Sequence, residues 1–171
     1  MLIQQKLISR EIGEYLWRAG ATLSTAESCT AGAVSAAIAA IPGASTYFKG
    51  GVVAYTDEVK QQLLNVPADL LQEKGAVSEE VAVCMAQGAC RAIGTDYAVA
   101  VTGFAGPTGG FEAPVGTIWI AVACHDDIQT RMLSGDDGRE ANTERAVLVA
   151  LEMLRARLQA DFPLSEEGAE G

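Results

Sequence analysis

The residues Tyr-Ala-Val-Ala-Val at positions 97–101 constrain the fold most strongly, because they form an apolar, β-prone run without polar alternation. Such a run is typical of a strand that is buried on both faces of its sheet. Helical patterns and strand patterns alternate along most of the chain, and one hairpin is expected near its end. The sequence therefore predicts a three-layer α/β/α domain on a mixed sheet.

The remaining elements follow from periodicity and from residues that begin or end helices. Ile8, Ile12 and Leu16 recur every four residues before Gly20, which predicts an amphipathic helix over 4–19. Further helices are expected over 31–41, 57–65, 67–74 and 79–93 and around 147–158, with Thr56 and Ser78 as caps, and strands over 22–25, 47–55, 116–124 and 128–133, with a turn at Asp126–Asp127. We expect one domain over 1–160 and a frayed acidic tail over 161–171.

The composition argues against several classes of protein. The chain of 171 residues has 12 basic and 22 acidic residues, a net charge of −10, and the basic residues do not cluster, which disfavours nucleic-acid binding. Its one histidine and its four cysteines, without a C-x-x-C pair, make a zinc site improbable. No run resembles a signal peptide or a membrane span, so we expect a cytoplasmic protein with reduced thiols.

The stretch Thr25–Gly32, Thr-Ala-Glu-Ser-Cys-Thr-Ala-Gly, is the predicted working centre, because a strand there turns directly into a helix. The first N–H groups of a helix lack partners and carry partial positive charge, which favours an oxyanion or a phosphate. Ser28 is the candidate nucleophile. Cys29 is a rival, because a helix N-terminus lowers the pKa of a thiol, although cysteine is more often simply buried.

A serine nucleophile needs a proton acceptor, and the residues alone leave two candidates. His125, followed by Asp126, could complete a triad, but a histidine in a hairpin turn is more often merely exposed. Lys60 could act if its reference pKa of about 10.4 fell by about three units, whereas most helix lysines are solvated. Tyr55 lies five residues before Lys60 and could share the same sheet edge, or satisfy a core hydrogen bond. The Gly103–Gly110 loop could form an anion nest or only a turn.

Several motifs in one order resemble the CinA C-terminal-domain family, the nicotinamide mononucleotide deamidases, in their stand-alone form. They are Thr-Ala-Glu-Ser-Cys-Thr-Ala-Gly, Gly-Gly-Val-Val-Ala-Tyr-Thr-Asp-Glu-Val-Lys60, Gly75-Ala-Val-Ser78, Thr102-Gly-Phe-Ala-Gly-Pro and Pro114-Val-Gly-Thr117. The resemblance implies a mostly parallel sheet of five strands, one antiparallel. It also implies that Ser28 is the nucleophile, that Lys60 activates it and that Tyr55 is the tyrosine of the Tyr-x-x-x-x-Lys motif.

The activity implied by the resemblance is that of a nicotinamide-nucleotide amidase in NAD salvage, which hydrolyses the carboxamide of nicotinamide mononucleotide to nicotinic acid mononucleotide and ammonia. No cofactor and no metal are expected. Arg139 and the glycine loop would hold the 5′-phosphate, and the expected substrate-binding residues are Cys29, Thr30, Gly32, Thr102, Gly103, Gly106, Gly109, Gly110 and Arg139. The expected partners are the small-molecule nucleotide and further copies of the chain, in a dimer or larger homo-oligomer, with no nucleic acid and no membrane.

Three positions depart from the family pattern. Ala31 replaces a frequent glycine, the loop at Phe111–Pro114 is one residue shorter and lacks a lysine before Pro-Val-Gly, and Thr143 stands where a second arginine follows Gly135, Asp136 and Arg139. Arg145, two residues later, could compensate for the missing arginine, but on a helix it lies about 200° further around the axis than Thr143. These departures bear on phosphate binding and motivate an alternative, a non-catalytic nucleotide-binding module. A role in DNA binding, which the family's association with DNA uptake suggests, conflicts with the charge of −10.

Overall fold

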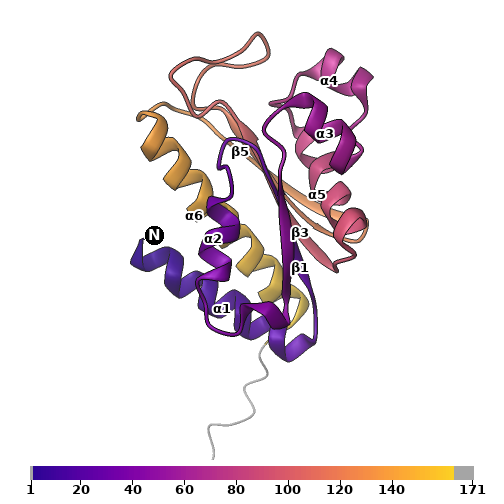
Figure 1. Ribbon diagram of the computed structural model, residues 1–171. Helices are drawn as coiled ribbons and strands as arrows, with labels where there is room; N and C mark the ends of the chain where they lie inside the picture. Colours follow the sequence, from indigo (N-terminus) through magenta and orange to yellow (C-terminus); the bar gives the residue numbers. More distant parts are fainter. Residues whose placement is uncertain (1, 164–171) are drawn as a thin grey trace, which may run out of the picture.

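A computed structural model describes residues 2–163 (Figure 1). Its elements are α1 (Ile3–Ala19), β1 (Leu23–Glu27), α2 (Ala33–Ala39), the 3₁₀ turn η1 (Ala44–Thr46), β2 (Phe48–Val53), α3 (Asp57–Leu64), α4 (Ala68–Lys74), α5 (Glu79–Ile93), β3 (Tyr97–Gly103), β4 (Ile118–Cys124), β5 (Asp127–Leu133) and α6 (Arg139–Asp161). The strands form one sheet in the order β2-β1-β3-β4-β5. β1 is parallel to β2 and β3, whereas β4 is antiparallel to β3 and β5. The prediction of a mixed, mostly parallel five-stranded sheet is confirmed.

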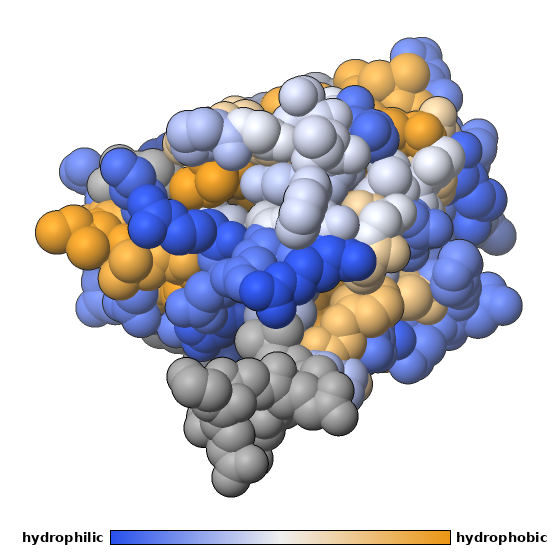
Figure 2. Space-filling model, turned by 90° about the horizontal axis from the view of Figure 1, so that it is seen from below, coloured by the Kyte–Doolittle hydropathy of each residue, from blue (hydrophilic) through white to orange (hydrophobic). Residues whose placement is uncertain are grey.

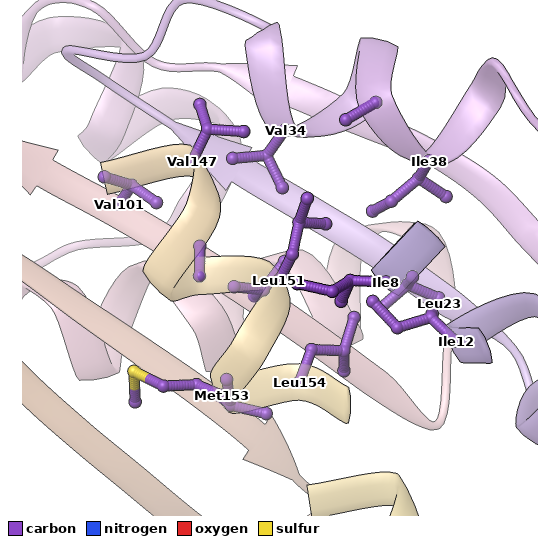
Figure 3. Packing of buried hydrophobic residues seen from close by; sticks show 14 of the residues in the cluster. Ile8, Ile12, Leu23, Val34, Ile38, Val101, Val147, Leu151, Met153 and Leu154 are labelled. Carbon is purple, nitrogen blue, oxygen red and sulfur yellow. The ribbon is translucent and has the colours of Figure 1, made fainter. Parts of the chain in front are cut away.

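Helices cover both faces of this sheet, as predicted. One core cluster joins the inner faces of α1, α2 and α6 to the sheet, and the other joins α3, α4 and α5 to the opposite face (Figure 1). Figure 3 shows Leu151 and Leu154 of α6 packed among Ile8 and Ile12 of α1 and Val34 of α2.

The two faces of strand β3 carry side chains of different size. Val99 and Val101 point into the cluster with α1 and α6, while Ala98 and Ala100 point toward α5. All four side chains are buried, as the apolar run at 97–101 predicts. The small alanines allow α5 to approach the sheet closely.

The topology brings three chain segments to one edge of the sheet. Glu27, the last residue of β1, pairs with Val53 at the end of β2 and with Val101 near the end of β3. The N–H of Ser28 donates to the carbonyl of Val101 at 2.9 Å. The segments that follow these three strands therefore begin side by side, as the carboxyl ends of parallel strands do.

Two boundaries near the predicted working centre differ from expectation. β1 continues to Glu27, and α2 starts at Ala33 rather than at 31. The residues between form a turn in which Ala31 and Gly32 have φ values of 49° and 96°. A helix cannot pass through these left-handed residues, which is why it begins later.

Two other predictions need correction. The β4–β5 turn is His125–Asp126 rather than Asp126–Asp127, with His125 at φ 54°. The helix continues through Asp161, which accepts a 2.7 Å hydrogen bond from the hydroxyl of Tyr97. The ring of Phe162 packs edge-on against Tyr97, with 6.3 Å between centroids. Residues 161 and 162 therefore belong to the domain, Pro163 follows the helix, and residues 164–171 of the predicted tail lie outside the described residues.

Candidate active site

Ser28 and Lys60 meet at the edge where the parallel strands end. The Nζ atom of Lys60 donates to Oγ of Ser28 at 3.1 Å and to the carbonyl of Ala54 at 3.0 Å. Ser28 follows β1, and Ala54 follows β2. Thr56 caps α3 by accepting from the N–H of Val59, which starts the helix that delivers Lys60.

Lys60 is buried to an extent that is rare for a lysine, with 2% of its surface exposed. Burial lowers the pKa of its amine, and the nearby Asp57 and Cys29 raise it by smaller effects. Among the ion pairs of residues 2–163, none involves Lys60. A desolvated amine without a carboxylate partner favours its neutral form, which can accept a proton from Ser28.

Glu27 fills the place where we expected an anionic substrate group. Its carboxylate, 1% exposed, accepts from the N–H groups of Gly32, Val34 and Ser35 at 3.1, 3.0 and 2.8 Å and from the Ser35 hydroxyl at 2.7 Å. An internal carboxylate therefore satisfies the N–H groups of Gly32, Val34 and Ser35, which leaves the preceding residues of the turn as the donors for the predicted oxyanion. Gly32 belongs to this cap rather than to a substrate contact.

The turn before α2 still offers backbone donors. The N–H groups of Cys29 and Thr30 donate to no acceptor on another residue within 2–163. The N–H of the residue after a serine nucleophile forms part of the oxyanion hole in hydrolases with a strand–turn–helix serine. The Cys29 N–H is thus the nearest donor to a carbonyl carbon attacked by Ser28.

Arg139 and Tyr55 stand together at the same site. Arg139, the first residue of α6, donates from Nη1 to the carbonyl of Gly106 at 2.6 Å and from Nη2 to the hydroxyl of Tyr55 at 2.8 Å. The Tyr55 side chain is about half exposed. Its hydroxyl makes no hydrogen bond to Ser28 or Lys60 within the described residues, although all three residues line the same cleft, as the shared sheet edge predicts.

These groups line one cleft with a volume of about 270 Å³. Its lining contains the predicted residues Ser28, Cys29, Tyr55, Lys60, Thr102, Gly103, Gly106 and Arg139, together with Asp57, Ala76, Val77, Phe104, Ala105 and Thr108. Asp57 and Arg139 give this cleft one carboxylate and one guanidinium. A ligand that carries both signs of charge would be complementary to it.

A model of the CinA C-terminal domain matches residues 5–158 of the chain. The chain belongs to this family. A CinA-like protein of Parasynechococcus marenigrum is 51% identical over 148 residues, which are 85% of this chain and 35% of that protein. A CinA-like protein of Geotalea uraniireducens is 50% identical over 81% of this chain and 33% of its own length. The chain thus spans about a third of the length of these curated relatives.

Solved CinA-type structures share the fold. A competence/damage inducible protein from Agrobacterium tumefaciens has a TM-score of 0.88 and 37% identity, covering 91% of this chain and 96% of its own. A CinA superfamily protein from Klebsiella pneumoniae has a TM-score of 0.88 and 34% identity, covering 92% and 99%. The resemblance first seen in the Ser28 and Lys60 motifs therefore identifies the CinA family correctly.

Four predicted binding residues lie outside the cleft lining of this CinA domain. The side chain of Thr30 is buried, and Gly32 donates to Glu27. Gly110 donates its N–H to the carbonyl of Ala113 at 3.0 Å, and a Cβ added at Gly109 would lie 2.6 Å from the N atom of Val115. The two glycines therefore shape a turn.

The rival nucleophile and the rival base are not supported. Burial raises the pKa of the Cys29 thiol to about 11, with a further rise from Glu27, so at neutral pH this group is a thiol. His125 is exposed in the turn after Cys124, which pairs with Tyr97 at the start of β3. Ser28 lies beyond Val101, about 13 Å further along the sheet. A Ser28–His125 pair is therefore excluded.

No neighbouring arginine takes the place of the family arginine that Thr143 replaces. The hydroxyl of Thr143 donates to the carbonyl of Arg139 at 2.8 Å, as threonines inside helices often do. Arg145 donates to the carbonyl of Gly135 at 2.7 Å and forms a 3.4 Å ion pair with Asp137. It supports the loop before α6 and does not line the cleft.

Two residues that sequence reasoning missed hold the site in place. Besides Glu27, the buried Asn142 donates from Nδ2 to the carbonyl of Ala105 at 2.9 Å and to Asp136 at 2.8 Å. It thereby ties the loop after β3 to the start of α6. Asn142 stands among polar residues in the sequence, Arg139–Arg145, so no local pattern singles it out.

Two kinds of feature are absent from the described part of the chain, a cluster of metal-ligating side chains and a membrane-spanning helix. Residues 2–163 contain no group of three or more His, Cys, Asp or Glu side chains placed to hold a metal ion. Within the same residues, no helix combines the length and apolar character needed to span a bilayer.

Proposed function

We propose that this CinA domain is a serine amidase that hydrolyses the carboxamide of nicotinamide mononucleotide. The observation that carries the proposal is the 3.1 Å contact between the buried amine of Lys60, which forms no ion pair within residues 2–163, and Oγ of Ser28 in the lining of the cleft. A solvated lysine would be charged and unable to accept a proton at neutral pH, whereas burial favours the neutral amine.

The reaction then uses groups already in place. Neutral Lys60 takes the proton of Ser28 while Oγ attacks the amide carbon, and the Cys29 N–H stabilises the oxyanion. The tetrahedral intermediate expels ammonia, which leaves with the proton returned by Lys60. Water next gives a proton to Lys60 and its hydroxide to the acyl carbon. The serine oxygen leaves and regains its proton from Lys60, releasing nicotinic acid mononucleotide.

The charges of the cleft fit this substrate. Nicotinamide mononucleotide combines a cationic pyridinium ring with an anionic 5′-phosphate. Asp57, three residues before Lys60, can face the cation, and Arg139 can bind the phosphate. Tyr55 acts through Arg139, whose guanidinium it holds at 2.8 Å, rather than as a proton carrier.

The test is release of ammonia by the purified chain from nicotinamide mononucleotide, nicotinamide riboside and nicotinamide. We expect the mononucleotide to react fastest, because the riboside and the free base lack the phosphate for Arg139. Ser28→Ala should release none. Equal rates for all three amides would contradict the assignment of the substrate, and no release from any of them would contradict the amidase.

A second candidate is a nucleotide-binding module without catalysis. It is favoured by the engagement of Arg145 with Gly135 and Asp137, which leaves Arg139 as the only arginine that lines the cleft among residues 2–163. Calorimetric binding of the mononucleotide without ammonia release would establish this module and exclude the amidase.

A further inference from the structure

Helix α1 exposes three large apolar residues on the side that faces away from the core. Its inner face, with Ile8, Ile12 and Leu16, is buried in the domain. On the outer side Ile3, Leu7 and Trp17 are 82%, 53% and 68% exposed. At about 100° per residue, Ile3, Leu7, Arg10, Glu14 and Trp17 fall within an arc of about 80°. We call these five residues the outer stripe.

A hollow lies directly beside the outer stripe. It has a volume of about 360 Å³ and is lined by Arg10, Gly13, Glu14 and Trp17 of α1 and by Ile41, Pro42, Gly43, Thr46 and Tyr47. Figure 2 looks at this end of the molecule, where α1 lies, and shows apolar areas separated by charged side chains. Large exposed apolar groups beside a hollow mark an interaction surface rather than an ordinary solvated helix.

The spacing of the outer stripe is that of a coiled-coil seam. Its positions are separated by four, three, four and three residues, which is the a and d pattern. When two copies of such a helix lie antiparallel, each a position faces a d position of the other. If the two helices cross midway between Arg10 and Glu14, Arg10 lies against the partner's Glu14 and Leu7 lies against the partner's Trp17. Because the pair is symmetric, each of these contacts occurs twice.

We propose that the outer stripe is the interface between two copies of this chain, packed antiparallel through α1. The charges favour a second copy over an unrelated partner, because the single arrangement that pairs the apolar residues also pairs opposite charges. Arg10 forms no ion pair within residues 2–163, whereas Glu14 contacts Arg18 at 2.7 Å through one carboxylate oxygen and its side chain is 50% exposed. The hollow beside Trp17 receives the partner's Leu7.

Sedimentation velocity of the full chain over a range of concentrations tests the proposal. The wild type should be a dimer, and Leu7→Lys should raise its dissociation constant by about a hundredfold, the effect of losing one buried leucine contact. Leu63→Lys is the matched control, because Leu63 is exposed to the same degree on α3, away from α1. It should leave the dimer unchanged.

A charge exchange tests the antiparallel register. Arg10→Glu and Glu14→Arg should each weaken the dimer by about a hundredfold, because each places like charges together twice. The double variant R10E/E14R restores both ion pairs and should dimerise to within about tenfold of the wild type. Circular dichroism verifies that each variant folds. A monomeric wild type, a dimer insensitive to Leu7→Lys, or a double variant as weak as the single ones would each overturn the proposal.

Discussion

Ser28 and Cys29 are neighbours in one turn, and their surroundings make only the hydroxyl a usable nucleophile. Ser28 contacts the buried amine of Lys60, while burial raises the pKa of Cys29 to about 11. We therefore expect Ser28→Ala to abolish ammonia release and Cys29→Ala to retain most of it. The measurement is steady-state hydrolysis of the mononucleotide with each purified variant. An active Ser28→Ala enzyme together with an inactive Cys29→Ala enzyme would establish a thiolate mechanism.

Lys60 determines the pH dependence of the proposed reaction. Because burial lowers its pKa, kcat/KM should rise with pH through a value below about 10.4, as the amine loses its proton. Lys60→Arg and Lys60→Ala should each lose at least about a hundredfold in rate, since neither residue can accept the proton. The measurement is a pH–rate profile for the wild type and both variants.

His125→Ala is the control for this profile. The imidazole is exposed in the turn between β4 and β5, at the opposite end of the sheet from Ser28, so the rate should change little. A profile that collapses in His125→Ala, or an active Lys60→Arg enzyme, would place the proton on another group.

The sequence predicts which residues belong to the site better than it predicts the contacts between them. The residue pattern alone leaves Lys60 and His125 both open as bases, because the choice depends on which segments the sheet brings together. The resemblance to the CinA family points to Lys60. The engagement of Tyr55 with Arg139, rather than with Lys60, depends on where α6 begins 84 residues later. No local pattern carries that information.

The short helix α2 depends on one buried carboxylate. Glu27 satisfies three N–H groups and one hydroxyl at its start, and these contacts hold the turn that carries Ser28. In Glu27→Gln, an amide group would face N–H donors at one of the two oxygen positions. We expect the free energy of unfolding to fall by about 1–3 kcal/mol. We also expect kcat to fall by about tenfold or more, because small displacements of a nucleophile slow its attack.

The control for Glu27→Gln lies at the other end of β1. Asp96 accepts from the N–H of Thr22 at 2.8 Å and from its hydroxyl at 2.9 Å. Asp96→Ala should destabilise the fold comparably without lowering kcat, when both variants are assayed well below their melting temperatures. If Glu27→Gln kept the wild-type kcat, Glu27 would have a structural role only.

At the level of elements, the two boundary errors near Ser28 share a cause. Thr-Ala-Gly-Ala-Val favours a helix from Ala31, but Ala31 and Gly32 adopt left-handed conformations so that the backbone can turn around the Glu27 carboxylate. For the same reason, the first N–H groups of this helix bind Glu27, and the donors left for an oxyanion lie one turn earlier. A tertiary hydrogen-bond network overrode local propensity, which periodicity cannot reveal.

At the scale of the whole molecule, alternation of helices and strands was sufficient to predict the three layers and the class of sheet. The strand order depends on contacts between distant segments, such as Leu23 of β1 with Tyr97 of β3, and the residue pattern alone does not predict it. The same order brings Ser28 and Lys60 together, so the site is a product of the topology. Burial of Lys60 must then affect the stability of the entire domain.

This effect can be measured as a function of pH. The pKa of Lys60 is lower in the folded state than in the unfolded chain, so between these two values the unfolded state binds more protons. The free energy of unfolding contributed by Lys60 therefore increases as pH rises toward about 10.4, the unfolded value. Below the folded pKa, the buried ammonium destabilises the domain by its full amount.

Lys60→Met removes this titration while keeping a long side chain in the same space. We expect the difference in unfolding free energy, wild type minus Lys60→Met, to increase between about pH 7 and about pH 10. The measurement is denaturant unfolding of both proteins at several pH values, in which contributions from the other titrating groups cancel. A difference that is constant with pH would show that Lys60 keeps an ordinary pKa in the folded state. A neutral lysine base would then be untenable, because the fold itself would offer no means of removing the proton from Lys60.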